Sequence, residues 1–323
     1  ITFVSENGYR EQKSWRELNI DVKILSNQYD KDRINILFSV LRASPDFIEN
    51  IVKEDVDFVI YQSEILTQRG LNYRVEENKE VTYNGLGTIG LYFYLALLSR
   101  ARLVLEVFPF NQTYLAKYNI QSLLFPVGYH QTLENKVEEE KELDVCFFGS
   151  YSLYRKEFFK KLRESGFSCH IVALEHNFFR DCSLSKTKIN LAIPINDNTM
   201  NHISPFRVYT GLYNGCMTLS VSCKSTPSVD GLLEYVPEEQ LVPRIKQLLA
   251  SGEHQKLQKT FKERFKKRNM TTMMKRLIPQ IKKCIQKDIY AGSHFPYTHY
   301  AQFKALPSQD IVLPPRPAKK IQT

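Results

Sequence analysis

The sequence predicts an α/β fold with two domains, each built on a parallel β-sheet, that face each other across a cleft. Apolar stretches alternate with helical segments in both halves of the chain, which is typical of parallel βαβ units. A polar, glutamate-rich segment without an apolar period, residues 131–142, separates the halves and is interpreted as a linker. The length of 323 residues also fits two domains.

The first half, residues 1–130, is predicted to form one domain. Residues 57–61 have the composition of a buried strand and are followed directly by Gln62-Ser63-Glu64. Residues 87–100 are expected to form a helix that is apolar on most faces. The other apolar stretches lie at 1–5, 20–25, 34–41, 102–107 and 122–125, and short helices are expected at 45–52 and 114–118.

The second half, residues 143–255, has the same alternation and is predicted to form the second domain. A strand at 143–148 ends in Gly149-Ser150, and an amphipathic helix follows at 155–165. The helix at 205–213 begins at a proline and is expected to stop before Gly215. The remaining predicted elements are strands at 169–174, 188–193 and 217–221 and a helix at 237–251.

The C-terminal part is predicted to be a basic amphipathic helix, residues 256–290, and a proline-rich tail, residues 291–323. Positions 256–287 hold twelve Lys or Arg residues and one acid, so this segment carries +11 and the rest of the chain is close to neutral. Pro279 is expected to kink or end the helix. Three interpretations of 256–287 stay open: the solvated face of a packed helix, a contact with the anionic inner face of a membrane, or a contact with nucleic acid.

The composition excludes several classes of protein. With 43% hydrophobic and 24% charged residues, the chain is not wholly disordered, collagenous or a disulfide framework. No apolar run approaches the ~20 residues of a membrane-spanning helix, and no secretory signal opens the sequence. Because Ile1 already lies in an apolar stretch, we expect only a residue or two to be missing before it. The six cysteines show no Cys-x-x-Cys spacing, which favours a cytoplasmic location and argues against a zinc site.

The first candidate site follows the strand 143–148. Ligands of open parallel sheets bind at the carboxyl ends of strands, so residues at these ends are the candidates. Gly149 and Ser150 form a small-residue turn whose N–H groups favour a phosphate, and Arg155 is a candidate partner for the oxyanion. An ordinary turn between a strand and a helix is the alternative interpretation.

A second anion site is predicted at the start of the helix 205–213. Ser204 is a candidate N-cap. Arg207 lies in the first helical turn, where a cation opposes the helix dipole and therefore suggests an anionic partner. His202 is a candidate proton donor to a phosphate. The alternatives are a surface arginine and a loop histidine without a function.

Three acids at the ends of apolar stretches are candidate general bases toward an acceptor hydroxyl: Glu6, Glu64 and Glu106. Glu64 is favoured because it directly follows a buried-type strand, although each acid also fits a solvated or structural role. The two Asp-x-Asp pairs, at 30–32 and 55–57, lie in a polar turn and at the entry of a strand. No metal site is therefore predicted.

The order of these features resembles the GT-B glycosyltransferases, especially the spore-maturation (CgeB-like) group with a short N-terminal domain. The resemblance covers roughly residues 58–280, and the first 57 residues match little. It rests on the order and spacing of Tyr61-Gln-Ser-Glu64, Phe125-Pro-Val-Gly-Tyr129, Asp144-Val-Cys-Phe-Phe-Gly-Ser150 with Tyr154-Arg155, Ser185-Lys-Thr-Lys-Ile-Asn-Leu191, Ser204-Pro-Phe-Arg-Val-Tyr209, Gly215-Cys-Met-Thr-Leu-Ser220 and the helix 237–251.

The resemblance implies two Rossmann-like domains, with a nucleotide-sugar donor on the C-terminal domain and an acceptor on the N-terminal one. Donor contacts would then fall on Gly149, Ser150, Arg155, Ser204 and Arg207. No metal cofactor is implied, because helix dipoles and basic side chains stabilise the leaving diphosphate. The base of the donor is left open, with UDP slightly favoured.

One position departs from the pattern of the family. Many relatives carry, three residues after the arginine, a glutamate that is expected to hold the donor's ribose, and this chain has Thr210 there. A hydroxyl holds a sugar less strongly than a carboxylate does. The leading hypothesis is a metal-independent glycosyltransferase acting on a glycan, lipid-linked or other hydroxyl. The alternatives are a phage-type DNA-base glucosyltransferase and a non-catalytic nucleotide-binding module.

Overall fold

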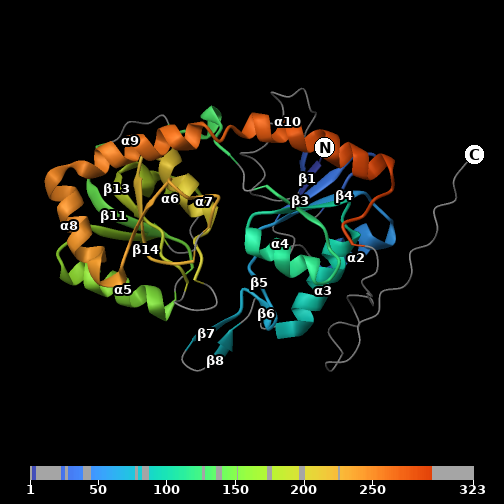
Figure 1. The fold of residues 1–323 in the computed structure, drawn as a ribbon, viewed down its shortest axis with the longest axis horizontal. Coiled ribbons are helices and arrows are strands. Elements are labelled where there is room, and N and C mark those ends of the chain that lie inside the picture. The colour runs from blue at the N-terminus through green and yellow to red at the C-terminus, as the bar shows by residue number, and fades with distance from the viewer. Residues whose placement is uncertain are drawn as a thin grey trace, which may run out of the picture. The chain divides into compact units, whose positions relative to one another are not determined.

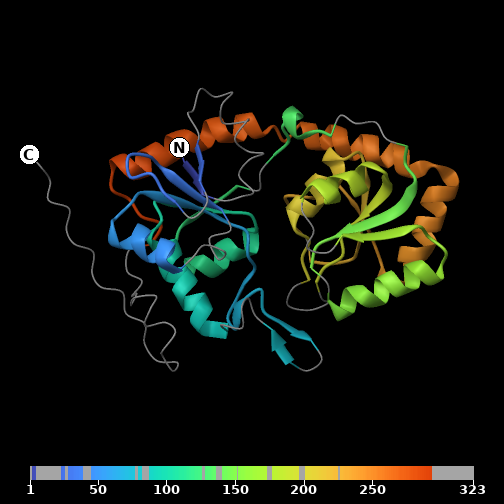
Figure 2. The same cartoon turned by 180° about the vertical axis from the view of Figure 1, so that it is seen from behind.

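The computed structural model describes most of the chain as two compact units (Figures 1 and 2). Unit 1 takes its residues from 1–73, 81–125 and the C-terminal part from 274, and unit 2 from 74–80 and 126–273. Both units have parallel sheets with helices, which confirms the predicted α/β class. The residues described are 2–4, 23–25, 28–38, 45–76, 79–81, 87–125, 128–135, 140–150, 152–172, 177–195, 201–224 and 226–292.

The sheet of unit 1 has six strands: β1 (Thr2–Val4), β2 (Lys23–Leu25), β3 (Asn35–Phe38), β4 (Phe58–Gln62), β9 (Leu103–Glu106) and β10 (Ser122–Leu124). All neighbours are parallel, in the order β10–β9–β4–β3–β1–β2. The five side chains of β4 are all buried, because this strand is covered on both faces. The carboxyl ends of β4 and β9 lie side by side, with Gln62 opposite Glu106.

Among the described residues of unit 1, the helices that pack with this sheet include α2 (Pro45–Lys53), α3 (Gly87–Arg100) and α4 (Pro109–Ala116). The run 91–98 of α3 is buried apart from Tyr92, as its apolar composition predicts. Helix α4 begins at Pro109, earlier than the predicted start at residue 114, because proline is well suited to the first helical position. Two small hairpins were not predicted: β5 (Leu66–Thr67) with β6 (Gly70–Leu71), and β7 (Arg74–Glu76) with β8 (Lys79–Val81).

The sheet of unit 2 has five strands: β11 (Leu143–Phe148), β12 (Cys169–Val172), β13 (Thr187–Leu191), β14 (Met217–Val221) and β15 (Glu234–Val236). They are all parallel, in the order β12–β11–β13–β14–β15. The first four confirm predicted strands, whereas β15 lies in a segment for which no strand was predicted. Residues of β11, β13 and β14 form the centre of the apolar core of this unit.

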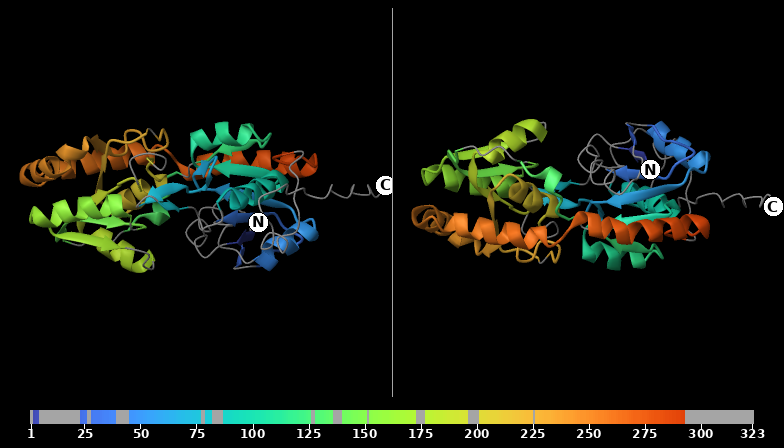
Figure 3. Two further views of the ribbon diagram at one scale, coloured as in Figure 1. Left: turned by 90° about the horizontal axis from the view of Figure 1, so that it is seen from below. Right: turned by 90° about the horizontal axis from the view of Figure 1, so that it is seen from above.

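The helices of unit 2 lie on both faces of its sheet (Figure 3). Helix α7 has the predicted bounds, because a proline begins it and Gly215, with a φ of +71°, follows its end. Helix α6 was not predicted. The helices are α5 (Leu153–Glu164), α6 (Asn177–Ser185), α7 (Pro205–Tyr213), α8 (Leu241–Ser251) and α9 (Glu253–Lys266), with short 3₁₀ turns at Gln131–Leu133 and Glu238–Gln240.

The basic segment predicted as one helix at 256–290 is two helices, α9 and α10 (Met270–Gln286). They are separated because Asn269 caps the second one: its Oδ1 accepts a hydrogen bond from the Thr272 N–H at 2.9 Å. Helix α10 continues past Pro279, which was expected to kink or end it. From residue 274 onward α10 belongs to unit 1, where Leu277 and Ile281 are buried.

The chain after α10 is fastened to unit 1 by an ion cluster around a buried arginine. The Arg102 side chain, which is 1% exposed, donates through Nε to Asp57 at 2.6 Å and through Nη1 to Asp288 at 2.5 Å. The ring of Tyr290 lies 3.8 Å from the Arg102 guanidinium carbon. Backbone bonds continue the attachment, since Ala291 donates to the Ala101 carbonyl at 2.8 Å. Residues 288–291 therefore lie against residues 101 and 102, just before β9 begins.

The predicted linker, residues 131–142, begins with the 3₁₀ turn Gln131–Leu133, and its described residues belong to unit 2. The His130 side chain caps this turn by accepting a hydrogen bond from the Thr132 N–H. No helix in the part of the chain that the structure describes is both long enough and apolar enough to cross a membrane. The predicted tail at 291–323 falls almost wholly outside the described residues.

Candidate functional site: the carboxyl edge of the unit 2 sheet

Arg207 lies at the carboxyl edge of the unit 2 sheet, where the chain leaves β11 and β13. Its Nε donates to the Phe148 carbonyl at 3.0 Å, and its Nη1 donates to the Ile193 carbonyl at 3.3 Å. The guanidinium carbon also stands 4.9 Å from the ring centroid of Phe147. The first turn of α7 and the ends of two neighbouring strands therefore hold this cation in a defined position.

Gly149 lies directly against the Arg207 side chain. Its backbone has a φ of +130°, which favours glycine over other residues. A Cβ atom at this position would lie 2.3 Å from Nη2 of Arg207, closer than any side chain tolerates. The absence of a side chain at Gly149 therefore leaves room for the Arg207 guanidinium.

Arg207 is a cation without an acidic partner among the described residues. Its acceptors are neutral backbone carbonyls. Burial alone lowers the pKa of Arg207 to about 10, so the group is charged at neutral pH. The positive end of the α7 dipole adds to this charge, and the first turn of α7 contains no acid. The arrangement favours an anion close to Arg207.

Ser204 precedes α7 at the predicted N-cap position. Its side chain makes no capping hydrogen bond, whereas its carbonyl accepts the Arg207 N–H at 3.0 Å. The N–H groups at the start of α7 are therefore not satisfied by this hydroxyl. A phosphate is one of the groups that commonly satisfies such a helix start.

Arg155 has a different environment from Arg207, although both were predicted to contact the donor. The Arg155 side chain is buried, and its Nε and Nη2 donate to the Ile193 carbonyl at 3.1 and 2.7 Å. Its Nε also lies 3.0 Å from the Pro194 carbonyl, and its Nη1 donates to the Ser150 carbonyl at 2.7 Å. These contacts favour a structural role for Arg155, which ties together the loops after β11 and β13.

Ser152 is a structural residue that was not predicted from the sequence. It is the true N-cap of α5, because its Oγ accepts the Arg155 N–H. The same hydroxyl donates to the Ile195 carbonyl at 2.7 Å. The sequence signal that could have identified this N-cap is a serine placed three residues before Arg155 at the start of the helix. Ser150, in contrast, is exposed at the same edge.

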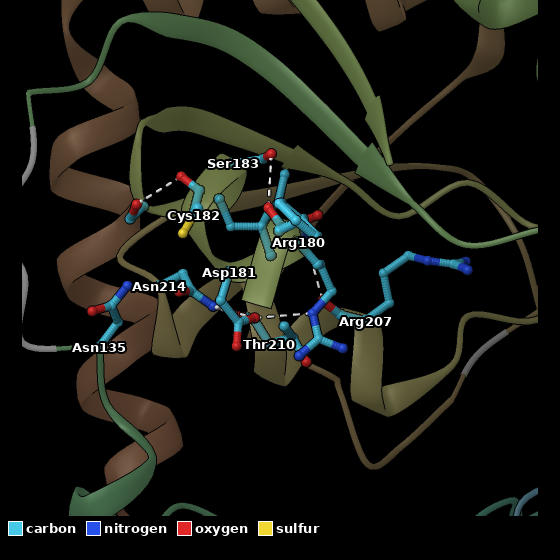
Figure 4. Close-up of polar contacts among 12 residues, drawn as sticks. Asn135, Arg180, Asp181, Cys182, Ser183, Arg207, Thr210 and Asn214 are labelled. Carbon is cyan, nitrogen blue, oxygen red and sulfur yellow. Dashed lines mark hydrogen bonds and ion pairs between the residues drawn. The ribbon is translucent and has the colours of Figure 1, made fainter. Parts of the chain in front are cut away.

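Thr210 lies one turn after Arg207 on α7 and adjoins a polar cluster that α6 contributes (Figure 4). The Asn214 amide donates to the Thr210 carbonyl at 2.9 Å and approaches Asp181 Oδ1 at 3.4 Å. Asp181 also pairs with Arg180 Nε at 2.9 Å. In Figure 4 the Arg207 guanidinium points away from this cluster. Because α6 was not predicted, the link from Asp181 through Asn214 to the Thr210 carbonyl was not predicted either.

His202 lies shortly before α7, where its backbone bridges that of Lys224. Burial, aided by the charge of Lys224, lowers the pKa of His202 to about 4. The imidazole is therefore neutral at pH 7 and has no acidic proton to give to a leaving phosphate. Its predicted role as proton donor is not supported by this environment.

In unit 1, Glu64 follows β4 and is held by a set of buried amide side chains. Gln62 binds both peptide groups of Glu64: its Nε2 donates to the Glu64 carbonyl, and its Oε1 accepts the Glu64 N–H, both at 2.7 Å. Asn111 of α4 donates to the same carbonyl at 2.7 Å. Asn72 donates to the Glu64 carboxylate at 2.5 Å. The loop is thereby fixed with the carboxylate partly exposed.

Glu106 ends β9 beside this loop and is completely buried. Its Oε1 accepts the N–H groups of Val107 and Phe108 at 2.8 and 2.9 Å and the Asn111 amide at 3.1 Å. Burial outweighs these hydrogen bonds and raises the pKa of Glu106 to about 8. The carboxyl is therefore mostly protonated at neutral pH, which favours a structural role. Glu6, the third candidate acid, lies outside the described residues.

The predicted Asp-x-Asp pairs take part in local structure. Asp30 Oδ1 accepts the N–H of Asp32 at 3.1 Å, and Asp57 pairs with Arg102. Among the described residues, no group of three or more His, Cys, Asp or Glu side chains is arranged to hold a metal ion. The six cysteines are free thiols.

No family model matches the sequence, and no curated protein matches it. An alpha-glucosyltransferase solved with UDP and a 13-mer DNA containing an HMU base is 10% identical, with a TM-score of 0.54 over 87% of this chain and 98% of that one. AviGT4, a glycosyltransferase involved in Avilamycin A biosynthesis, is 11% identical, with a TM-score of 0.49 over 85% of this chain and 88% of that one. TarM is 8% identical, with a TM-score of 0.48 over 78% of this chain.

These likenesses concern the fold. This chain spans 55% of the length of TarM. The likeness to the alpha-glucosyltransferase extends over nearly its whole length. The chain is therefore an α/β protein of two Rossmann-like units with the GT-B fold.

Proposed function

We propose that this protein is a glycosyltransferase that moves a sugar from a nucleoside-diphosphate donor to an acceptor hydroxyl. The observation that carries the proposal is Arg207, a defined cation without an acidic partner in the described chain, at the start of α7. In an open parallel sheet this edge is where ligands bind. The GT-B fold supports this chemistry by analogy.

In the proposed reaction, unit 2 binds the donor and unit 1 the acceptor. The acceptor oxygen loses its proton to a carboxylate and bonds to the anomeric carbon, while the bond from that carbon to the diphosphate breaks. The leaving diphosphate gains negative charge, which Arg207 and the α7 dipole stabilise without a metal ion. Gly149, Ser150, Ser204 and Thr210 are the proposed further donor contacts.

Glu64 is the proposed general base. Its loop is fixed by amide side chains on both peptide groups, and its carboxylate is partly exposed. Such support is what a catalytic group needs in order to keep its position. Glu106 is a poorer candidate, because it is buried and mostly protonated at neutral pH.

A UDP-sugar is the proposed donor, because the alpha-glucosyltransferase of the same fold was solved with UDP. Placement in the spore-maturation (CgeB-like) group is also a proposal, supported by the sequence segments that resemble it. A reducing cytoplasm as the location is supported by the free thiols.

Two other functions compete with this proposal. Transfer to a base of DNA is favoured by the basic C-terminal helices and by the DNA present in the structure of the alpha-glucosyltransferase. A non-catalytic nucleotide-binding module is favoured by Thr210, which leaves α7 without a carboxylate at that position.

A turnover assay tests the proposal. Purified protein is incubated with UDP-sugars and GDP-sugars and with hydroxyl acceptors, and nucleoside diphosphate release is measured. Wild type is expected to release it from one donor, and Arg207→Ala to lower kcat/KM by about 100-fold or more. Glu64→Gln is expected to lower kcat while the KM for the donor stays the same. Donor binding without release by the wild type would favour the non-catalytic module.

A further inference from the structure

The outer face of α10 is a strip of positive charge on unit 1. Lys275, Arg276, Lys282 and Lys283 are all exposed, and Lys287 follows directly after the helix. At 100° per residue these side chains fall within an arc of about 140°. The opposite face carries Met274, Leu277 and Ile281, which are at most 2% exposed. The strip therefore stands on a helix whose orientation is fixed by the core.

No acid within α10 neutralises this strip. The segment 270–292 contains a single acid, Asp288, and its carboxylate accepts hydrogen bonds from Arg102 at 2.5 Å and Tyr290 at 2.8 Å. On α5, by contrast, Lys156 and Lys160 alternate with Glu157 and Glu164. A strip of one sign attracts a partner of the opposite sign.

We propose that this face of α10 binds the phosphate backbone of a nucleic-acid duplex. From residue 275 to residue 287 the strip is about 18 Å long at 1.5 Å per residue. One duplex strand carries a phosphate every 3.4 Å along the axis, so this length faces roughly five phosphates. Five basic side chains thus meet a similar number of anionic groups. Binding of a duplex to α10 does not require sugar transfer. Transfer of a sugar to the bound duplex would rest on the proposed function.

A membrane surface fits this face less well. Amphipathic helices that bind lipid bury an apolar face in the headgroup region. The apolar face of α10 is already buried in unit 1, so it has nothing to insert. In the sequence, the nearest exposed large apolar side chain is Ile289, beyond the helix. Binding of α10 to lipid headgroups would then depend on charge alone. The experiment below distinguishes lipid binding from duplex binding.

The test is a salt titration of duplex binding. Fluorescence anisotropy of a labelled 20-base-pair DNA duplex is measured with the full chain between 50 and 200 mM NaCl. Five phosphate contacts give a slope of log K against log salt near −4.5, which weakens binding about 500-fold over this range. The double variant Lys282→Gln/Lys283→Gln is expected to bind at least tenfold more weakly at 50 mM and to reduce the magnitude of the slope by about 2.

The matched control removes the same charge from α5 in Lys156→Gln/Lys160→Gln, and it is expected to bind the duplex as the wild type does. Nucleotide binding, measured on the same samples, separates this proposal from the proposed function: the α10 variant retains it, and Arg207→Ala retains duplex binding. The proposal is overturned if the wild type shows no binding at 50 mM. It is equally overturned if both double variants weaken binding alike, or if vesicles with 30% phosphatidylserine bind and the duplex does not.

Discussion

Replacing Glu106 with glutamine is expected to leave stability nearly unchanged at pH 5 and to make the protein more stable than the wild type at pH 8. The folded state holds the Glu106 proton up to a pKa of about 8, whereas the unfolded chain releases it near the ordinary pKa of 4.5. Unfolding between these values therefore releases a proton, and the stability of the wild type falls as pH rises through this window. The stability that the protonated Glu106 carboxyl provides is fully present below pH 4.5, and it is lost above pH 8.

Glutamine at position 106 removes this pH dependence of stability but keeps the hydrogen bonds from the backbone N–H groups. Its Oε1 accepts the same N–H groups of Val107 and Phe108, and its amide replaces the protonated oxygen. At 1.36 kcal/mol per pKa unit, the relative gain at pH 8 is of the order of 4 kcal/mol. Urea unfolding of both proteins at pH 5, 6.5 and 8 measures it. Glu157→Gln, at an exposed site on α5, is the control and should follow the wild type. If the free energies of unfolding of Glu106→Gln and the wild type change with pH in parallel, Glu106 is ionised in the folded protein.

Replacing Arg102 with alanine is expected to destabilise unit 1 by about 3–5 kcal/mol. The side chain is 1% exposed and joins Asp57, at the entry of β4, to Asp288, after α10. Its removal leaves a partly buried carboxylate without its partner and empties the space under the Tyr290 ring. Urea unfolding measures the loss, and protease cleavage near residue 288 is expected to become faster.

Two controls separate charge from packing at this position. Arg102→Met restores most of the volume, so its loss is expected to be smaller than that of Arg102→Ala. Arg33→Ala removes an arginine of unit 1 that is 28% exposed and pairs with Asp30, and it is expected to cost less than about 1 kcal/mol. A loss below about 1 kcal/mol for Arg102→Ala would mean that the ion cluster does not fasten the C-terminal segment.

The sequence was sufficient to predict the elements whose signals are local. Strand β14 and helix α7 have their predicted bounds, because a buried apolar run defines one and a proline and a glycine delimit the other. The break between α9 and α10 was missed because it depends on one capping side chain, Asn269, inside a continuous amphipathic pattern. Helix α6 was missed because it is short and its apolar residues Phe178 and Phe179 are exposed.

The positions of Arg155 and Arg207 near strand ends could be predicted from the sequence, but their different environments could not. Arg155 and Arg207 look equivalent in the sequence, since each follows a strand near a helix start. Only the three-dimensional structure reveals that Arg155 donates through Nε, Nη1 and Nη2 to carbonyls of two loops, whereas Arg207 donates through Nε and Nη1 to one carbonyl each. The attachment of Asp288 to Arg102 joins residues 186 positions apart, and no local pattern encodes such a contact.

A thermal-shift panel with UDP, GDP, CMP, ADP and the corresponding sugar nucleotides tests whether Arg207 binds the diphosphate of a donor. It is run on the wild type, Arg207→Ala and Arg244→Ala. The control Arg244 is also in unit 2, but it is engaged by Glu234 and Glu253, so its loss perturbs stability without touching the anion site. A ligand at 100 times its dissociation constant adds about 2.7 kcal/mol of stability. We expect a shift with one nucleotide that Arg207→Ala loses and Arg244→Ala keeps. A shift that Arg207→Ala retains would contradict this expectation.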